Sequence, residues 1–262
     1  AAEIADAAFR QLMIEAADTD KDGKISIDEA NALTSLNLSG KGLKTVDLFY
    51  FEKLEDLDLS NNELTDLDLS MQMGLKNLNI SHNKFAKLNL SRQTVLETLN
   101  ASNNGITELG DLASKKFTTI DLSYNKLAKV RIYFINDLVK LNLSHNELKE
   151  AEIRENPKLA DMDVSFNQIS EMTMWSLKGL VNVKFNDNPF IQLNEAPKWT
   201  LLETIDCSNT SISKLNLSEN SALRKCVATG CPSLGTIYIP ADSTAEVVKD
   251  DNTALVKGAP AE

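Results

Sequence analysis

Apolar residues recur along most of this chain with a period of 21 residues, at positions 1, 4, 6, 11 and usually 14 of each repeat. Positions 3 to 7 alternate between polar and apolar residues, which predicts a short strand with one buried face. No repeat could bury its apolar face alone, so the repeats are expected to stack on one another. They begin at Leu33, Leu54, Leu75, Leu96, Phe117, Leu138, Leu159 and Leu180 and, after a slip of one residue, at Leu202 and Leu223.

The most regular repeat reads LEDLDLSNNELTDLDL over residues 54–69. This matches the pattern L-x-x-L-x-L-x-x-N-x-L, so residues 33–239 resemble a leucine-rich repeat array. The resemblance implies an α/β solenoid that is mostly β, a right-handed array with a parallel strand stack and about ten repeats. The short repeat is similar in style to those of bacterial extracellular, internalin-like proteins.

Inside each repeat, positions 4 and 6 are expected to point inward and form a continuous core. Position 4 carries Leu57, Leu78, Leu99, Ile120, Leu141, Met162, Val183 and Ile205. The second half of the repeat also alternates and leaves no room for a long helix. Short extended or 3₁₀ segments are therefore expected on the convex side.

Position 9 is an asparagine in most repeats, and an amide side chain can satisfy backbone groups where a strand ends. We expect these side chains to form a structural ladder inside the turn: Asn62, Asn83, Asn104, Asn125, Asn146, Asn167 and Asn188. Lys41, Thr210 and Cys231 take this position in the end repeats, where caps are needed.

Residues 18–29, just before the first repeat, read DTDKDGKISIDE and match the twelve-residue EF-hand calcium loop. Gly23 falls at the sharp turn, and Ile25 is the apolar anchor. The calcium ligands that the motif implies are the carboxylates of Asp18, Asp20 and Asp22, the carbonyl of Lys24, a water on Ser26 and the bidentate carboxylate of Glu29. The alternative is an acidic turn that binds no metal.

Two helices are expected to flank this EF-hand or dockerin-like loop. Phe9, Leu12, Met13 and Ala16 share one helical face, and Ser26 with Glu29 forms a capping box for a short helix that runs to about Leu33. Calcium sensors pair two such loops, whereas this sequence has one. We therefore predict that calcium stabilises a cap, with the helices packed on Leu36, Leu38 and Leu43. The predicted domains are the cap 1–32, the solenoid 33–240 and a C-terminal cap or tail 241–262.

The exposed strand face, positions 2, 3, 5, 7 and 8, is where solenoids usually bind partners. Position 8 varies most, and rings at successive repeats would lie about 4.8 Å apart. The candidate partner-binding residues are His82, Tyr124, His145 and Phe166. Clustered aromatic residues are typical of binding hot spots, but such rings also stack on each other and stabilise a sheet.

Aromatic and sulfur-containing side chains also gather on the convex side. An early group holds Phe49, Tyr50, Phe51, Met71 and Met73, and a later group holds Tyr133, Phe134, Met172, Met174 and Trp175. We interpret these groups as core filling or end packing in preference to a ligand patch. Cys207, Cys226 and Cys231 are predicted to be small buried residues.

Composition narrows the function. Acidic residues outnumber basic ones by 38 to 27, which disfavours a nucleic-acid partner, and the sequence lacks an apolar run of about 18 residues that could span a membrane. The two histidines, His82 and His145, lie three repeats apart, so one zinc ion cannot bind both. We expect no catalysis; glycoside hydrolysis by two carboxylates is the disfavoured alternative.

These features predict a non-catalytic, calcium-binding repeat protein that binds a protein or glycan at the bacterial surface or exterior. We expect a monomer whose targeting segment has been removed or lies outside this sequence. The second hypothesis is a structural spacer with no specific ligand. The sequence does not name the ligand.

Overall fold

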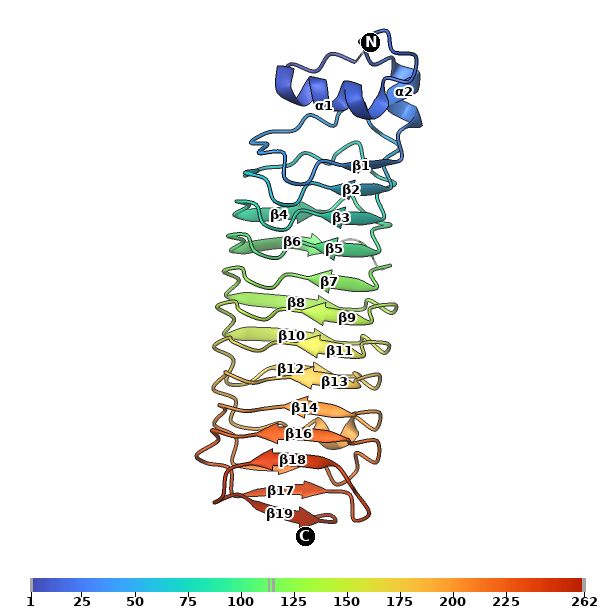
Figure 1. Cartoon of the computed structure of the whole chain (residues 1–262). Coiled ribbons are helices and arrows are strands. Elements are labelled where there is room, and N and C mark those ends of the chain that lie inside the picture. Colours follow the sequence, from blue (N-terminus) through green and yellow to red (C-terminus); the bar gives the residue numbers. More distant parts are fainter. Residues whose placement is uncertain (1, 113, 115, 261–262) are drawn as a thin grey trace. The chain divides into compact units, whose positions relative to one another are not determined.

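The computed structural model describes residues 2–112, 114 and 116–260. The chain divides into two compact units, Ala1–Asn125 and Lys126–Glu262. Both units are β-solenoids of parallel strands, as the repeat pattern predicts (Figure 1).

The first unit opens with two helices. Helix α1 (Ala7–Ala17) is capped by Asp6, whose side chain accepts a hydrogen bond from the Phe9 N–H at 2.7 Å. Helix α2 (Ile27–Ala32) starts at Ser26 with the predicted capping box, which confirms that reading of the sequence. Phe9 and Met13 are buried as expected. Ala16 was predicted to share their buried face, but it is exposed and the next residue, Ala17, is buried instead.

One parallel sheet of the first unit is built from the strands at positions 3 to 5 of the repeats. These strands are β1 (Ser35–Asn37), β2 (Asp56–Asp58), β3 (Asn77–Asn79), β5 (Thr98–Asn100) and β7 (Thr119–Asp121). Each pairs with the next at an offset of one repeat, so Leu57 lies opposite Leu36 and Leu78. Strands β4 (Lys87–Leu90) and β6 (Glu108–Leu112) pair in the second half of the repeats.

The second unit repeats this plan. Its first set of strands is β9 (Lys140–Asn142), β11 (Asp161–Asp163), β13 (Asn182–Lys184), β14 (Thr204–Asp206), β16 (Lys225–Ala228) and β18 (Glu246–Lys249). The second set is β8 (Lys129–Tyr133), β10 (Glu150–Arg154) and β12 (Thr173–Trp175), then β15 (Lys214–Asn216), β17 (Thr236–Ile239) and β19 (Ala254–Lys257).

The one-residue slip in the sequence is accommodated between β13 and β14. Val183 pairs with Ile205, an offset of 22 residues, and a short 3₁₀ helix η1 (Ala196–Lys198) with Pro197 in its first turn lies in the connection. The repeat geometry also continues past Pro240, because β18 and β19 add to β16 and β17 in parallel. The tail therefore contributes strands to the stack.

The interior follows the predicted pattern at positions 4 and 6, which are buried from Leu36 to Cys226. The serines of position 7 differ from expectation, because the sequence placed them on the exposed face. Ser81 and Ser123 are 5% and 4% exposed. The cause is position 5: the Asn79 side-chain oxygen accepts from both the Ser81 N–H and its hydroxyl, a turn that draws the serine inward.

Position 8 also lies off the strand, in the turn that follows it. Its backbone is left-handed in the middle repeats, with φ from 52° at His82 to 56° at Asp187. Side chains of this size rarely adopt that conformation, because Cβ approaches a carbonyl oxygen. Glycine takes the position at both ends of the array, at Gly40 and Gly230, both with positive φ.

The asparagine ladder forms as predicted. The Asn83 amide donates to the carbonyl oxygens of Leu59, Ile80 and Ser81, and its oxygen accepts from the Leu64 N–H. Each ladder side chain therefore ties its own turn to the preceding repeat. The two exceptions in the last repeats keep part of this pattern, since Thr210 donates to the carbonyl of Cys207 and Cys231 lies 3.2 Å from the same oxygen.

Sequence reasoning missed a second, partial ladder at position 19, in the turn at the far end of the repeat. Four of its buried members donate to carbonyl oxygens of the preceding repeat: Gln72, Gln93, Asn156 and Asn220. The fifth, Ser114, donates to the Leu96 carbonyl at the start of its own repeat. The signal in the sequence was a polar residue at position 19 of most repeats. It was weak, because the residue type changes from repeat to repeat.

Candidate functional site

The predicted calcium loop connects α1 and α2, and it brings three carboxylates together. Oxygen atoms of Asp18, Asp20 and Asp22 lie within 4.8 Å of one another, on a loop that is largely exposed. Backbone N–H groups hold all three side chains. The Asp18 carboxylate accepts from Lys21 and Gly23 at 2.8 and 2.9 Å, Asp20 accepts from the Asp22 N–H, and Asp22 accepts from the Lys24 N–H. Like charges this close repel each other, so a cation among them would be favoured.

Gly23 provides the turn that this loop needs. Its φ is +79°, and no atom lies within 4 Å of the place where a Cβ would stand. The neighbouring Lys21 is also left-handed, with φ of 63°. Ile25 is buried at 2% exposure, which anchors the loop to the helices as the motif implies. The loop backbone therefore has the conformation that a sharp, oxygen-lined turn requires.

Glu29, the predicted bidentate ligand, lies outside this group of three and serves as a cap. One carboxylate oxygen accepts from the Ser26 N–H and hydroxyl, both at 2.9 Å. The other accepts from the Thr19 N–H and hydroxyl at 2.7 and 2.9 Å. The backbone N–H groups of Ser26 and then Thr19, followed by the two hydroxyls, lower the pKa of Glu29 from 4.5 to about 2.

The residues present fit calcium in chemistry. Calcium takes six to eight oxygen ligands, and three carboxylates already converge on one point. Lys24 and Ser26 follow at loop positions 7 and 9, where a carbonyl and a bridging water are expected. Glu29 accepts five hydrogen bonds at the edge of the loop, so its carboxylate would exchange these bonds for metal coordination.

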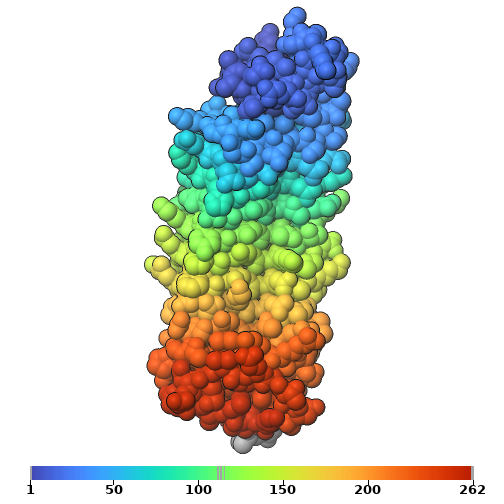
Figure 2. Space-filling view, viewed as in Figure 1, coloured from blue at the N-terminus to red at the C-terminus, as the bar shows by residue number. Residues whose placement is uncertain are grey.

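The helical pair covers the end of the first unit. Strand β1 has a neighbour on one side only, yet Leu36, Leu38 and Leu43 are 4%, 3% and 7% exposed. In Figure 2 the N-terminal residues, in blue, cover this end of the stack. The cap therefore supplies the burial that a preceding repeat would otherwise give.

The four predicted partner-binding residues fall two in each unit. In the first unit, His82 is exposed and Tyr124 is 51% exposed, with the repeat of Asn103 between them. In the second unit, the rings of His145 and Phe166 stack at 4.2 Å with an interplanar angle of 9°. Phe166 remains 45% exposed. The exposed part of the Phe166 ring is therefore available to a partner, while the stacking holds the two rings against each other.

An open groove continues this edge of the second unit past Phe166. It has a volume of about 490 Å³ and is lined by the next position-8 residues, Asp187 and Asn209, together with Pro189 and Pro232. The Asn209 amide donates to the Asp187 carboxylate at 2.9 Å, which holds both side chains at the rim. The ring pair and the groove thus form one lateral surface, which we call the ring edge: His145, Phe166, Asp187, Pro189, Asn209 and Pro232.

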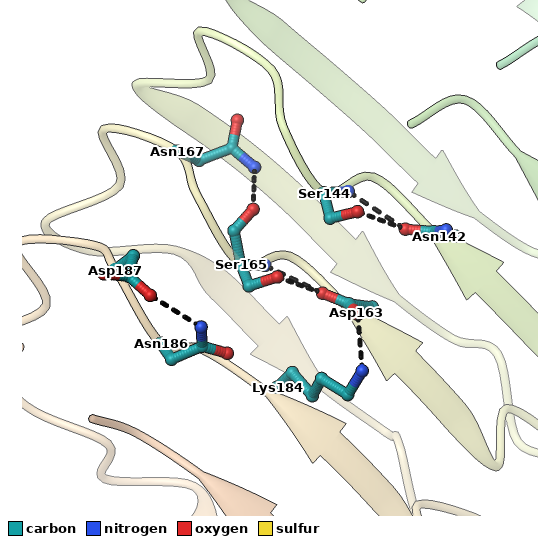
Figure 3. Close-up of polar contacts among 8 residues, drawn as sticks. All are labelled: Asn142, Ser144, Asp163, Ser165, Asn167, Lys184, Asn186 and Asp187. Carbon is teal, nitrogen blue, oxygen red and sulfur yellow. Dashed lines mark hydrogen bonds and ion pairs between the residues drawn. The ribbon is translucent and has the colours of Figure 1, made fainter. Parts of the chain in front are cut away.

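The strand face beside the ring edge is polar, as Figure 3 shows. Asp163 accepts from the Ser165 hydroxyl at 2.6 Å and pairs with Lys184 at 3.2 Å on the neighbouring strand. Asn186 stands where other repeats have serine and donates to Asp187 at 2.7 Å. Its own oxygen is buried without a hydrogen-bond partner. Most polar groups on this face thus bond to one another, which fixes their positions.

The strand face of the first unit forms a shallow hollow of about 460 Å³. Its outward side chains come from Ser, Thr, Asn and Asp residues, among them Asp56, Asp58 and Asp121. Neighbouring strands are linked side chain to side chain, as when Thr98 donates to Asn77 at 2.6 Å. The residues that line this hollow include no lysine or arginine, so its potential is negative.

The aromatic and sulfur-containing residues of the convex side are only partly core residues, which differs from our interpretation as core filling or end packing. Phe51 and Met174 are buried, but Phe49, Met73, Phe134 and Trp175 are 56%, 62%, 50% and 42% exposed. The cysteines agree with the prediction, because Cys207, Cys226 and Cys231 are buried free thiols. A hydrogen bond with Cys226 and, after it, burial raise the pKa of the Cys207 thiol well above its ordinary value.

Comparisons with known proteins support the repeat architecture. Residues 53–71 match the family Leucine Rich Repeat. The chain is similar to the functional domain of InlJ from Listeria monocytogenes, described as including a cysteine ladder, with a TM-score of 0.75 and 24% identity over 89% of this chain. This chain spans 55% of that one.

Two further structures are similar. The leucine-rich repeat domain of APL1B matches with a TM-score of 0.74 and 20% identity, over 86% of this chain and 71% of that one. The internalin inlF from Listeria monocytogenes matches with a TM-score of 0.53 and 15% identity, over 98% and 96%. A comparison with curated proteins found no match. The structural similarity, expressed by these TM-scores, establishes the leucine-rich repeat fold. Among the described residues, no helix is long and apolar enough to cross a membrane.

Proposed function

We propose that this leucine-rich repeat solenoid is a non-catalytic binding protein of the bacterial surface or exterior, with a calcium ion that stabilises its N-terminal cap. The observation that carries the proposal is the convergence of Asp18, Asp20 and Asp22 within 4.8 Å, on the loop between the two capping helices. Lys24, Ser26 and Glu29 complete the proposed ligand set. Calcium would supply charge neutralisation and a rigid link between α1 and α2.

The cap gives calcium a structural role. Helix α2 has six residues, too few to be stable without tertiary support. A ligand that binds only the folded loop stabilises it by mass action, by about 2.7 kcal/mol at a hundred times its Kd. Extracellular modules bind calcium with Kd values of roughly 10⁻⁴ to 10⁻³ M, which suits an exposed loop.

A thermal melt tests this role. The intact chain is heated in buffers that contain about 5 mM calcium, about 5 mM magnesium or EDTA. The same series is run on the double variant that carries both Asp18→Asn and Asp22→Asn. We expect calcium to raise the Tm of the unmodified chain by about 2–4 °C relative to EDTA. The double variant should melt at one temperature in all three buffers. Equal melting of the unmodified chain with and without calcium would remove the structural role.

The partner surface in this proposal is the ring edge of the second unit, with His82 and Tyr124 as additional candidates in the first. An exposed aromatic ring beside a groove is typical of a binding hot spot. Leucine-rich repeat folds generally serve as protein-binding scaffolds, and a glycan is the alternative ligand. A combined array of host-surface proteins and glycans identifies the partner, and the Tyr124→Ala and Phe166→Ala double variant then tests the surface. Unchanged binding by a folded double variant would place the partner elsewhere.

The second candidate function is a calcium-stabilised spacer. The self-bonded polar side chains of the strand face favour it, because groups such as Asp163 and Lys184 already satisfy each other. A spacer should bind no member of the array, with or without calcium.

A further inference from the structure

The second sheet of the second unit, β8–β10–β12, has an outer face that the proposed function does not use. Its outward side chains lie in rows across the sheet, because the three strands pair in register. One row is Arg131, Glu152 and Thr173, and the next row, two residues along, is Tyr133, Arg154 and Trp175. Inward neighbours such as Ile132 and Ile153 are buried. The outer face is therefore fixed by the core beneath it.

The second row is an aromatic cluster around one guanidinium group. The Arg154 guanidinium lies 4.9 Å from the centre of the Tyr133 ring, 5.1 Å from that of Trp175 and 5.5 Å from that of Phe134. Glu152 accepts from Arg154 at 2.5 Å. Cation–π contacts and the ion pair hold the rings in place. Phe134 and Trp175 nevertheless remain 50% and 42% exposed.

A hollow of about 250 Å³ adjoins this cluster. Its volume is slightly below the ~300 Å³ at which ligand pockets usually begin, so it suits a small ring. Its charged and hydroxyl-bearing lining residues are Lys129, Arg131, Glu150, Glu152, Glu171 and Thr173. Cationic donors on β8 and carboxylate acceptors on and beside β10 therefore line one cavity, next to exposed ring faces.

The charged side chains that line the hollow, taken together with Arg154, carry no net charge. Lys129, Arg131 and Arg154 carry three positive charges, and Glu150, Glu152 and Glu171 carry three negative ones. Glu152 pairs with both arginines, at 3.4 Å to Arg131 and 2.5 Å to Arg154. A ligand of either sign would meet as much repulsion as attraction. The complementary ligand is uncharged.

We propose that this face binds a neutral oligosaccharide, with one sugar ring stacked on Trp175 and the next in the adjoining hollow. A pyranose ring has a C–H face that packs on an aromatic ring, and each hydroxyl both donates and accepts, which matches mixed carboxylates and cations. An apolar side chain of a protein partner fits poorly, because it would bury these charges without bonding to them. The face is separate from the ring edge, so either can fail alone.

Tryptophan fluorescence of the full chain tests the proposal, because the sequence has two tryptophans and Trp199 is 2% exposed. Trp199→Phe leaves Trp175 as the sole reporter. The probes are tetra- to hexasaccharides of neutral glucan, mannan, galactan and chitin, with sialylated oligosaccharides and acidic and basic peptides as comparators. We expect one neutral series to shift the emission to shorter wavelength and to saturate.

Variants then separate this face from the others. Trp175→Ala should weaken the oligosaccharide, measured by calorimetry, at least tenfold. Leu201→Ala, which removes an exposed side chain outside both surfaces, should leave it unchanged, and both variants should melt within a few degrees of the parent. Binding of none of the neutral probes, binding confined to the charged probes, or binding that a folded Trp175→Ala variant retains in full would each overturn the proposal.

Discussion

The side-chain oxygen of Asn83 accepts a hydrogen bond from the backbone N–H of Leu64, one repeat earlier, at 2.9 Å. The same side chain donates to three carbonyl oxygens, and it is 9% exposed. A single residue thus satisfies backbone groups of two repeats that water cannot reach. The ladder is therefore a cooperative link between neighbouring repeats.

Asn83→Ala should accordingly destabilise the chain strongly. Each buried group left without a partner costs about 1–3 kcal/mol, so we expect a loss of about 2–4 kcal/mol in urea unfolding. Asn89→Ala is the matched control, because Asn89 is exposed and its side chain accepts one hydrogen bond, from Ser91. A loss for Asn83→Ala no larger than that for Asn89→Ala would contradict this role of the ladder.

A similar loss of stability is expected for the partial ladder at position 19, of which Asn156 is the member tested in the second unit. Asn156 is fully buried, accepts from the Ile135 N–H at 3.0 Å and donates to Ile132 and Arg154. Asn156→Ala should lower the free energy of unfolding by about 1–3 kcal/mol. The exposed Asn194 serves as the control for Asn156. Indistinguishable unfolding curves for the two alanine variants would mean that water replaces the Asn156 side chain at little cost.

The lowered pKa of Glu29 leads to a prediction of how the stability of the cap changes with acid in the absence of calcium. Its folded pKa of about 2 lies below its ordinary value of 4.5. A lowered pKa contributes stability that is complete above about pH 4.5 and is lost as pH falls toward 2. In EDTA, the stability gap between the parent chain and Glu29→Gln should therefore shrink over that window. A gap that stays constant between pH 5 and pH 2 would show that the Glu29 hydrogen bonds do not form in solution.

The stacked rings of His145 and Phe166 give a double-mutant test. Aromatic pairs contribute about 0.5–1.5 kcal/mol beyond their buried area. The His145→Ala and Phe166→Ala changes should therefore be coupled by about that amount in urea unfolding. His145→Ala with the distant Tyr238→Ala provides an uncoupled comparison. Zero coupling between His145 and Phe166 would leave binding, and not stability, as the reason for the ring pair.

Much of this architecture could be predicted from the sequence, because the 21-residue period fixes which residues face inward. Leu57 and Asn62 took their expected places for this reason, whereas the capping box at Ser26 follows from a local motif before the first repeat. The period does not set the backbone conformation at single positions. Ser81 is drawn inward by its bond to Asn79, and His82 is left-handed in the turn, so neither stands on the strand face.

The sites were harder to predict, since they depend on contacts between repeats. The calcium motif placed Asp18, Asp20 and Asp22 together, but it does not reveal that the Glu29 carboxylate also accepts hydrogen bonds from Thr19. Trp175 reads as an apolar residue at a regular interval, which suggests burial. Its exposure follows from the strand register, which sets it beside Arg154 on the outer row of the sheet.

The central claim is that the loop of residues 18–29 binds calcium, and a calorimetric titration tests it most directly. Calcium is titrated into the intact, chelator-treated chain and into Asp20→Asn, with Asp28→Asn as a control that keeps the loop ligands. One calcium per chain should bind to the parent and to Asp28→Asn, and Asp20→Asn should bind at least tenfold more weakly. Absence of binding heat in the parent at millimolar-scale calcium, or equal binding by Asp20→Asn, would contradict the account.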